Sequence, residues 1–388
     1  MALESKSKIA IIGGGPAGCF CAYCLKQNGF SPVIFEKNSP LKTLLPTGGG
    51  RCNLAHAEFD FKELAKNYPR GEKFLYSVFS KFSTSDTIEV FEKIGVKTYI
   101  QDDMRIFPIS NSASDVRAKM LEAIKGAKFI KENVLSVKPC NGGYEVKTNG
   151  GSYFFEKVIF SIGGHASFDL LKNLGIEIVA PKPALTGLRT IQNFKSLSGV
   201  SVQNVSAKVG KQNFRGDFLF THDGISGPVV FTVSSIMARE AFPYKITFDF
   251  AGEIDLQCML NENPHKSVKN LLSGLVPKSF AAYITEHAGV SENLKCSDVN
   301  GKIRNAILKY LNDFEVEAVS VSGGGEVVTS GGVDLREVNS KTLEAKKYQG
   351  IYFCGEVLDI DGLCGGFNLQ NCWSTGYLAA QGVAKSAN

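Results

Sequence analysis

Near the N-terminus, the pattern of hydrophobic and polar residues is typical of one βαβ unit. Residues 8–12 (KIAII) predict an apolar strand, and residues 32–36 (PVIFE) predict a second one. Between them, residues 16–27 predict a helix that ends at Asn28 and Gly29, residue types that often terminate helices. A strand, a glycine-rich turn, a helix and a strand thus follow one another within about 30 residues, the length of a βαβ unit.

Hydrophobic spacing predicts further helices and strands in the first half of the chain. Aromatic and aliphatic side chains recur at helical spacing in residues 71–82, and we interpret them as the buried face of a helix. Residues 133–138, 144–148 and 153–162 predict strands, and the last of these runs into a glycine pair. The first part of the chain is therefore expected to be α/β.

The pattern changes in the middle of the chain. Alternating segments such as VSVQNVSAKVG and YKITFDF predict a β-rich region from residue 187 to about residue 255. Residues 264–314 predict helices. After the glycines of residues 323–325, a strand (KYQGIYFCGE) and a final helix at residues 369–384 return to α/β character.

These changes predict two domains, one of them discontinuous. A chain of 388 residues is longer than a single ordinary hydrophobic core supports. We expect residues 1–186 and 326–388 to form one domain. Residues 187–325 are expected to form an inserted domain with a helical part at about residues 264–314.

Composition narrows the class of protein. Hydrophobic residues make up 44% and charged residues 21%, as in ordinary globular enzymes. The net charge of +5 is spread along the chain without a block of Lys and Arg, so we expect neither a nucleic-acid partner nor a membrane partner. No secretory signal is recognisable, and the ten Cys are therefore expected to be reduced thiols of a cytoplasmic protein.

The turn of the βαβ unit carries the first chemical motif, GGGPAG. Gly13, Gly15 and Gly18 form a G-x-G-x-x-G pattern, which allows a tight turn, close approach of a pyrophosphate and close packing of the helix. The helix N-terminus then directs N–H groups and a positive dipole end toward the phosphates. Glu36, at the end of the second strand, is placed to accept ribose hydroxyl hydrogen bonds. The motif predicts a dinucleotide site, and the acidic residue disfavours NADP.

Two further glycine-rich segments favour FAD over NAD. In TGGGRCN, Arg51 and Asn53 follow a glycine run that can line a long ligand beyond its adenosine half. Near the C-terminus, Gly355 and Glu356 form a strand-end turn that can bind a ribityl hydroxyl. The N-terminus of the final helix, around Asn368, can face the pyrimidine edge of a flavin. An NAD site does not need such a return of the C-terminal segment.

Four segments together resemble a known family of flavoproteins: TGGGRCN, GDFLFTHDGISGPVVF, VVTSGGVDLREV and IYFCGEVLDIDGLCGGFNLQNCWSTGYLAA. Over nearly its whole length the chain is similar to bacterial FAD-dependent oxidoreductases of the aminoacetone-oxidase-like and bile-acid-reductase-like type. The resemblance implies an α/β fold, a Rossmann-type FAD-binding domain with a parallel sheet, interrupted by an inserted β-barrel-like domain with a small helical part. It implies FAD contacts at the matching motif positions, which are Gly13, Gly15, Gly18, Glu36, Arg51, Asn53, Glu356, Asp361 and Asn368.

One segment departs from this family. After SIGG, its members usually carry a longer glycine-rich stretch, whereas HASFDLLKNLGIEIVAPKPAL is shorter here. The resemblance therefore does not extend a ligand role to Gly163, Gly164 or His165.

The cysteines do not form a recognisable redox or metal motif. Cys52 lies in the segment expected near the flavin, but disulfide reductases need a second Cys five residues later, where this chain has Ala57. We interpret Cys52 as a packed residue, since nothing in the sequence indicates a lowered thiol pKa. Cys21 and Cys24 form C-x-x-C inside the phosphate-binding helix, where packing is the better interpretation.

His222 is the histidine with the strongest claim to a functional role. In THDGISGP it precedes Ser226, a candidate helix N-cap, and Pro228, suited to the first helical position. A substrate-facing and a structural role both remain open for it. The other histidines lack metal-ligand spacing, and no metal site is expected; they are His56, His165, His265 and His287.

These features predict hydride transfer between FAD and an unidentified small organic substrate. We expect the insert to form one wall of the substrate pocket, with His222 and Arg51 as the candidate catalytic residues; Arg51 could hold a substrate anion or a flavin phosphate. No second dinucleotide motif is recognisable, so NAD(P)H is expected to reduce the flavin only transiently. The alternative is a flavoprotein that acts on RNA or serves as a redox-sensing partner.

Overall fold

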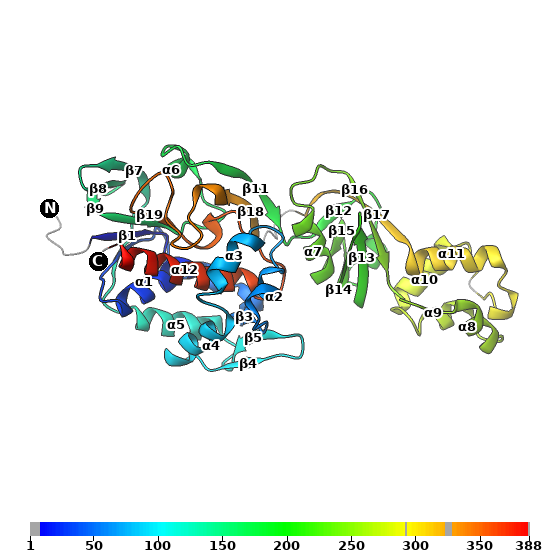
Figure 1. The fold of residues 1–388 in the computed structure, drawn as a ribbon. Helices are drawn as coiled ribbons and strands as arrows, with labels where there is room; N and C mark the ends of the chain where they lie inside the picture. The colour runs from blue at the N-terminus through cyan, green and yellow to red at the C-terminus, as the bar shows by residue number, and fades with distance from the viewer. Residues whose placement is uncertain (1–7, 292, 323–327, 387–388) are drawn as a thin grey trace. The chain divides into compact units, whose positions relative to one another are not determined.

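The structure, a computed structural model, describes residues 8–291, 293–322 and 328–386. The chain divides into two compact units. Unit 1 comprises Met1–Lys182 and Val328–Asn388, and unit 2 comprises Pro183–Val327. Both ends of the chain therefore build unit 1 (Figure 1). The glycines of residues 323–325, where the sequence predicts the return to the first domain, lie outside the described residues.

A five-stranded parallel sheet forms the centre of unit 1, in the order β19-β10-β1-β2-β6. Its strands are β1 (Ile9–Ile12), β2 (Val33–Phe35), β6 (Lys128–Ile130), β10 (Lys157–Phe160) and β19 (Ile351–Phe353). The three inner strands and β19 are almost entirely buried, whereas the edge strand β6 is largely exposed. Their short apolar sequences are what a parallel sheet covered on both faces requires. The predicted Rossmann-type sheet is confirmed.

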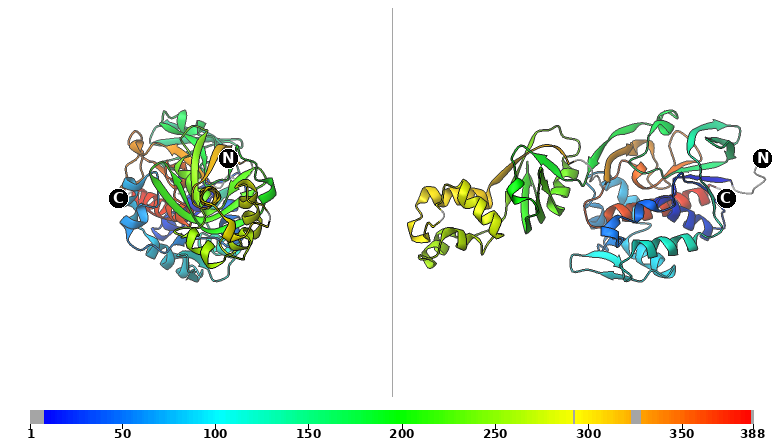
Figure 2. Two further views of the ribbon diagram at one scale, coloured as in Figure 1. Left: turned by 90° about the vertical axis from the view of Figure 1, so that its right-hand side faces the viewer. Right: turned by 180° about the vertical axis from the view of Figure 1, so that it is seen from behind.

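Two helices from opposite ends of the chain pack side by side in unit 1. The predicted helix at residues 16–27 is confirmed as α1 (Pro16–Gln27), and the final helix is α12 (Phe367–Lys385). Both views show them adjacent (Figure 1, Figure 2). A Cβ added at Gly376 would lie 2.9 Å from the Ala17 carbonyl oxygen, so a glycine permits this close approach.

The remaining elements of unit 1 surround this centre. Its other helices are α2 (Phe61–Ala65), α3 (Glu72–Phe79), α4 (Thr84–Lys93), α5 (Ala113–Ala123) and α6 (Asp169–Lys172). Two three-stranded sheets are formed by β3 (Ala55–His56), β5 (Arg105–Pro108) and β4 (Thr98–Ile100), and by β7 (Val134–Cys140), β8 (Gly143–Thr148) and β9 (Ser152–Phe155). β11 (Ile178–Ala184) and β18 (Val328–Val333) form a two-stranded sheet.

One sequence prediction for unit 1 was wrong. Residues 153–162 form two strands, because β9 pairs antiparallel with β8 while β10 pairs parallel with β1 in a different sheet. The chain turns at Glu156, whose N–H group and that of Lys157 both donate to the carbonyl of Lys8. The hydrophobic pattern is continuous across this corner because both strands are partly buried, which is why the sequence suggests one strand.

Unit 2 contains a closed antiparallel barrel in the order β12-β15-β14-β13-β16-β17, so the predicted barrel-like insert is confirmed. The strands are β12 (Leu188–Thr190), β13 (Ser201–Val209), β14 (Gln212–Thr221), β15 (Gly224–Ser226), β16 (Tyr244–Asp249) and β17 (Phe314–Val321). Its interior is aromatic: the Phe218 ring lies 4.7 Å from that of Phe220 and 4.8 Å from that of Phe248. Alternating inward positions supply this core.

Helices complete unit 2. They are α7 (Pro228–Ile236), α8 (Leu256–Glu262), α9 (Val268–Leu272), α10 (Lys278–His287) and α11 (Gly301–Asn312). α8 to α11 lie together at one end of the barrel (Figure 1, Figure 2). Unit 2 holds as many Lys and Arg as Asp and Glu, so the net charge of +5 resides in unit 1. Within the described ranges, every helix is too short or too polar to cross a lipid bilayer.

Candidate FAD site

The glycine turn after β1 leaves room for a ligand at one of its three glycines. Gly13 has φ +106°, and a Cβ there would lie 2.3 Å from the Ser161 carbonyl oxygen. A Cβ at Gly18 would lie 2.0 Å from the Gly13 carbonyl oxygen. At Gly15, which caps α1, the nearest atom to an added Cβ is Oγ1 of Thr43, 3.7 Å away. A side chain at Gly13 or Gly18 would therefore clash with the backbone, whereas Gly15 faces the open space at the helix N-terminus.

Glu36 follows β2 and connects the turn to the next loop. Its half-buried carboxylate accepts hydrogen bonds from the N–H groups of Gly14, at 2.8 Å, and Asn38, at 2.7 Å. A carboxylate has about four lone-pair sites, so two remain for ribose hydroxyls. Glu36 thus fixes the turn and can still bind a ligand.

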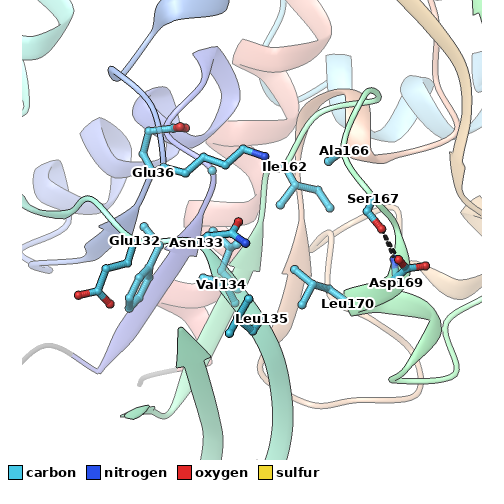
Figure 3. Close-up of a pocket in the computed structure, with 14 residues that line it drawn as sticks. Glu36, Glu132, Asn133, Val134, Leu135, Ile162, Ala166, Ser167, Asp169 and Leu170 are labelled. Atoms are coloured by element: carbon cyan, nitrogen blue, oxygen red, sulfur yellow. Dashed lines mark hydrogen bonds between the residues drawn. The ribbon is translucent and has the colours of Figure 1, made fainter. Parts of the chain in front are cut away.

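Two adjoining cavities meet at this turn, sharing Gly13, Glu36, Lys37 and Ile162. The first, of about 330 Å³, has an apolar wall (Figure 3). That wall is formed by Ile12, Phe35, Val134, Leu135, Ile162, Ala166 and Leu170. The second, of about 200 Å³, extends along the glycine turn to Thr43, Glu356 and Cys372.

The residues present fit the adenosine diphosphate half of FAD. A planar adenine suits the apolar first cavity, the ribose meets Glu36, and the pyrophosphate can reach the N–H groups at the N-terminus of α1. Gly15 supports this fit independently, because its missing side chain leaves the pyrophosphate path open.

The TGGGRCN segment forms a compact turn whose side chains are held by the protein. The 3-10 helix η2 (Thr47–Gly50) contains Gly48 at φ 58° and Gly49 at φ 67°. Arg51 donates from Nε to the Gly48 carbonyl at 3.4 Å, and its guanidinium carbon lies 4.1 Å from the centroid of the Phe107 ring. Among the described residues, no carboxylate pairs with Arg51, so its charge is available to a ligand.

Asn53 joins the two glycine-rich segments that the sequence predicts near the flavin. In the amide orientation that satisfies its neighbours, it donates to the Ala55 carbonyl at 3.0 Å and accepts from the Gly366 N–H at 3.0 Å. Gly366 caps α12, and a Cβ there would lie 2.5 Å from the Ala55 carbonyl oxygen. Asn53 is buried and therefore positions the start of α12.

The C-terminal candidates differ in what they contact. Gly355, at φ +77° in η6 (Gly355–Val357), donates its N–H to Oγ1 of Thr375 at 2.9 Å, and Glu356 lines the second cavity. Asp361 is fully buried and makes a bidentate ion pair with Arg70, at 2.6 and 2.8 Å.

Asn368 bridges the loop before α12. Its Oδ1 accepts from the N–H of Gly362 and its Nδ2 donates to the Gly362 carbonyl, both at 2.9 Å. Asp361 and Asn368 thus hold the loop in shape, and their contact with FAD stays a prediction.

His222 lies in unit 2, in the exposed turn between β14 and β15, and its proposed role stays a prediction. The expectation that Ser226 caps the following helix was wrong. α7 begins at Pro228, as predicted, but Gly227 is its N-cap, because Ser226 still pairs with Leu219 in the barrel.

Several residues that line the second cavity were not predicted as site residues from the sequence. Gly163, Gly164 and His165, to which the resemblance extends no role, line the second cavity. They follow β10, the neighbour of β1, and ligands of parallel sheets bind beyond the carboxyl ends of such strands. The strand that runs into a glycine pair was therefore a usable signal.

Burial raises the pKa of the thiols around the site. Cys52 is fully buried in the turn after η2, and desolvation raises the pKa of its thiol to about 12. In α1, burial also raises the pKa of the Cys24 thiol, and the Sγ of Cys19 donates to the Gly14 carbonyl at 3.3 Å. These contacts agree with the interpretation of the cysteines as packed residues.

The glycine turn, the acidic residue after β2 and the paired cavities define an FAD-binding Rossmann flavoprotein. Comparison with known families agrees: residues 7–382 match the HI0933-like protein Rossmann domain family. The chain belongs to this family, and its cofactor is FAD.

Relatives align over nearly the full chain. The ribosomal RNA dihydrouridine synthase of Escherichia coli (strain K12) is 28% identical, covering 97% of this chain and 98% of the relative. The 3-dehydro-bile acid delta(4,6)-reductase of Clostridium scindens is 27% identical, covering 98% and 99%. A flavocytochrome c3 fumarate reductase in its open conformation shares the fold, with 16% identity, a TM-score of 0.51 and coverage of 98% and 78%.

Proposed function

We propose that this FAD-dependent oxidoreductase transfers a hydride between the flavin and a small organic molecule with a carbon–carbon double bond conjugated to a carbonyl. The pair of cavities at the glycine turn carries the proposal, because it fits the non-reacting half of FAD and leaves the flavin half to the segments around Arg51 and Asn368. Bound FAD supplies the hydride chemistry. The bile acid reductase among the relatives supports a conjugated double bond as the reacting group.

The chain's own groups then bind and orient the substrate. Arg51 has an unpaired charge on a fixed guanidinium, which suits a carbonyl oxygen that gains negative charge during hydride addition. His222, in an exposed turn of unit 2, remains our second candidate catalytic residue. We propose NAD(P)H as a transient reductant of the flavin.

A second candidate function is reduction of a uridine base in RNA. The relative from Escherichia coli favours it, since dihydrouridine is uridine with hydrogen added across a double bond conjugated to a carbonyl. The two candidates therefore share the same chemistry at the flavin. They differ in whether a phosphate backbone contributes to binding, and the net positive charge of unit 1 is compatible with either.

Anaerobic stopped-flow mixing tests the proposal. Holoprotein is first exposed to NADH or NADPH to follow flavin bleaching, and the reduced protein is then mixed with 2-cyclohexen-1-one or with unmodified ribosomal RNA. Return of the oxidised flavin absorbance with the enone supports the first candidate, and return with RNA and a steep salt dependence supports the second. Reduced flavin that reacts with neither acceptor would contradict both. His222→Ala should slow the reaction while FAD remains bound.

A further inference from the structure

His56 is held in one orientation beside the start of α12. It lies in β3, three residues after Asn53, and pairs in register with Arg105 of β5. Its Nδ1 lies 3.1 Å from the Gly365 carbonyl oxygen, and its ring stacks on Phe367 with 4.6 Å between centroids. The imidazole therefore touches the segment that the sequence predicts at the flavin.

The hydrogen bond of His56 determines its tautomer. A carbonyl oxygen only accepts, so Nδ1 carries the proton and Nε2 of the neutral ring is an acceptor. Among the described residues, Nε2 has no hydrogen-bond partner, and the side chain is half-buried. The orientation thus presents one basic nitrogen to a ligand.

Burial favours the neutral ring. Desolvation lowers the pKa of His56, and the positive charge of Arg105 acts in the same direction. The Gly365 carbonyl and the carboxylates of Asp103 and Glu58 oppose this shift. Cys364, in the loop before Gly365, is a further titratable group of this region, and desolvation raises the pKa of its thiol. A lowered pKa means that neutral Nε2 can accept a proton and that the protonated ring gives it up readily.

The Arg51 guanidinium is held against the small sheet that contains His56. Phe107 is two residues after Arg105 on β5, so the two side chains share a face of the small sheet. The guanidinium carbons of Arg51 and Arg105 lie 4.1 and 5.6 Å from the Phe107 centroid. Asp103 pairs with Arg105. Arg51 has no carboxylate partner in the part of the chain that the structure describes. Phe107, against which the Arg51 guanidinium lies, thus belongs to the same small sheet as His56.

We propose that His56 is the proton-transfer residue of the flavin reaction, with Arg51 holding the substrate oxygen. The assignment rests on the proposed hydride transfer. In the reductive direction, the β-carbon of the substrate takes a hydride from reduced flavin, and the α-carbon takes the Nε2 proton of protonated His56. The flavin is left oxidised, the imidazole neutral and the double bond saturated. A nicotinamide dinucleotide restores the reduced flavin, and solvent restores the proton.

The test uses oxidised holoprotein and a phenol, so that it does not depend on turnover. A phenol that gives its proton to Nε2 becomes a phenolate next to Arg51, and a phenolate against oxidised flavin produces a long-wavelength charge-transfer band. We expect p-chlorophenol to produce this band at neutral pH. Its affinity should fall as the pH drops below the lowered pKa of His56, because Nε2 is then already protonated.

A matched pair of variants separates proton transfer from packing. In His56→Asn the amide can keep the donor to the Gly365 carbonyl but lacks the acceptor at Nε2. We expect full FAD content, a phenol dissociation constant raised about tenfold or more, and loss of its pH dependence. His265→Asn, at an exposed position of unit 2, should behave as the wild type.

Two results would overturn the assignment. One is a wild-type protein that gives no charge-transfer band, and the other is a His56→Asn variant with unchanged affinity and pH dependence. Failure of hydride transfer to any acceptor, together with a normal band, would instead count against the proposed function.

Discussion

At the adenosine end of the FAD site, Gly15 and Glu36 face the cavities, whereas at the flavin end Asn53, Asp361 and Asn368 are bonded to other parts of the protein. The adenosine end therefore offers a ligand groups that the turn exposes directly. The flavin end uses conspicuous polar residues to fix two loops and the start of α12. A residue in a ligand motif can thus act by contact or by positioning, and the two roles predict different consequences of substitution.

Substitutions of the turn glycines are expected to have the largest effects. They should distinguish a glycine needed for FAD binding from one needed for packing. Gly15→Val should abolish FAD binding with little change in apoprotein stability, because its side chain enters the pyrophosphate path. Gly18→Ala should destabilise the apoprotein by about 3 kcal/mol, because a Cβ would meet the Gly13 carbonyl. FAD titration and urea unfolding of the apoproteins measure the two quantities. Equal loss of stability in both variants would remove the distinction.

Substitution of Asp361 should lower the stability of the apoprotein more than it affects contact with FAD, because this residue holds the loop before α12 in shape. Asp361→Ala leaves the Arg70 charge without its buried partner and is expected to lower the free energy of unfolding by about 3–5 kcal/mol. Asp361→Leu combined with Arg70→Met removes both charges and should recover part of the loss. Urea unfolding of the apoproteins tests this. If the Asp361→Ala apoprotein were as stable as the wild type but bound FAD weakly, Asp361 would be a direct FAD contact.

Glu36 is expected to have an intermediate effect, mainly on affinity. Glu36→Ala removes the acceptor for the Gly14 and Asn38 N–H groups and for ribose hydroxyls, which should weaken FAD binding by about 1–3 kcal/mol. Glu36→Gln keeps one acceptor oxygen and should lose less. Calorimetric titration with FAD measures both. Unchanged affinity in Glu36→Ala would mean that another group holds the ribose.

Substitution of Cys52 is expected to have the smallest effect on the flavin reaction. Its thiol pKa of about 12 means that the reactive thiolate forms only as the pH approaches that value. At pH 8, iodoacetamide should label the exposed Cys140 and leave Cys52 unmodified in the native protein, as peptide mass spectrometry can show. Cys52→Ala should reduce its flavin at the wild-type rate. Rapid labelling of Cys52 would reopen a redox role.

Local features of the sequence predicted the βαβ unit around the glycine turn. The G-x-G-x-x-G turn, α1 and Glu36 lie within one βαβ unit, so spacing and hydrophobic pattern are sufficient to place them. The barrel strands also follow from local alternation. The strand break at Glu156 was missed because pairing partners, which sequence periodicity does not reveal, determine it.

The side-chain contacts of the flavin end could not be predicted from the sequence, because they join distant parts of the chain. Arg70 and Asp361 are separated by 291 residues, and His56 and Gly365 by 309. The sequence indicates that these segments lie near the flavin, but it does not show which polar group meets another protein group. The sequence therefore gives His56 no functional role, because its contacts are with residues far away in the chain.

Binding of ADP to the apoprotein is the most direct test of the division between the two ends. ADP fills only the adenosine and pyrophosphate part of the site, so calorimetry should show binding to the wild type and none to Gly15→Val. Asn368→Ala, which removes the bridge to Gly362, should bind ADP like the wild type and bind FAD more weakly. An Asn368→Ala variant that loses ADP as completely as Gly15→Val would contradict the account.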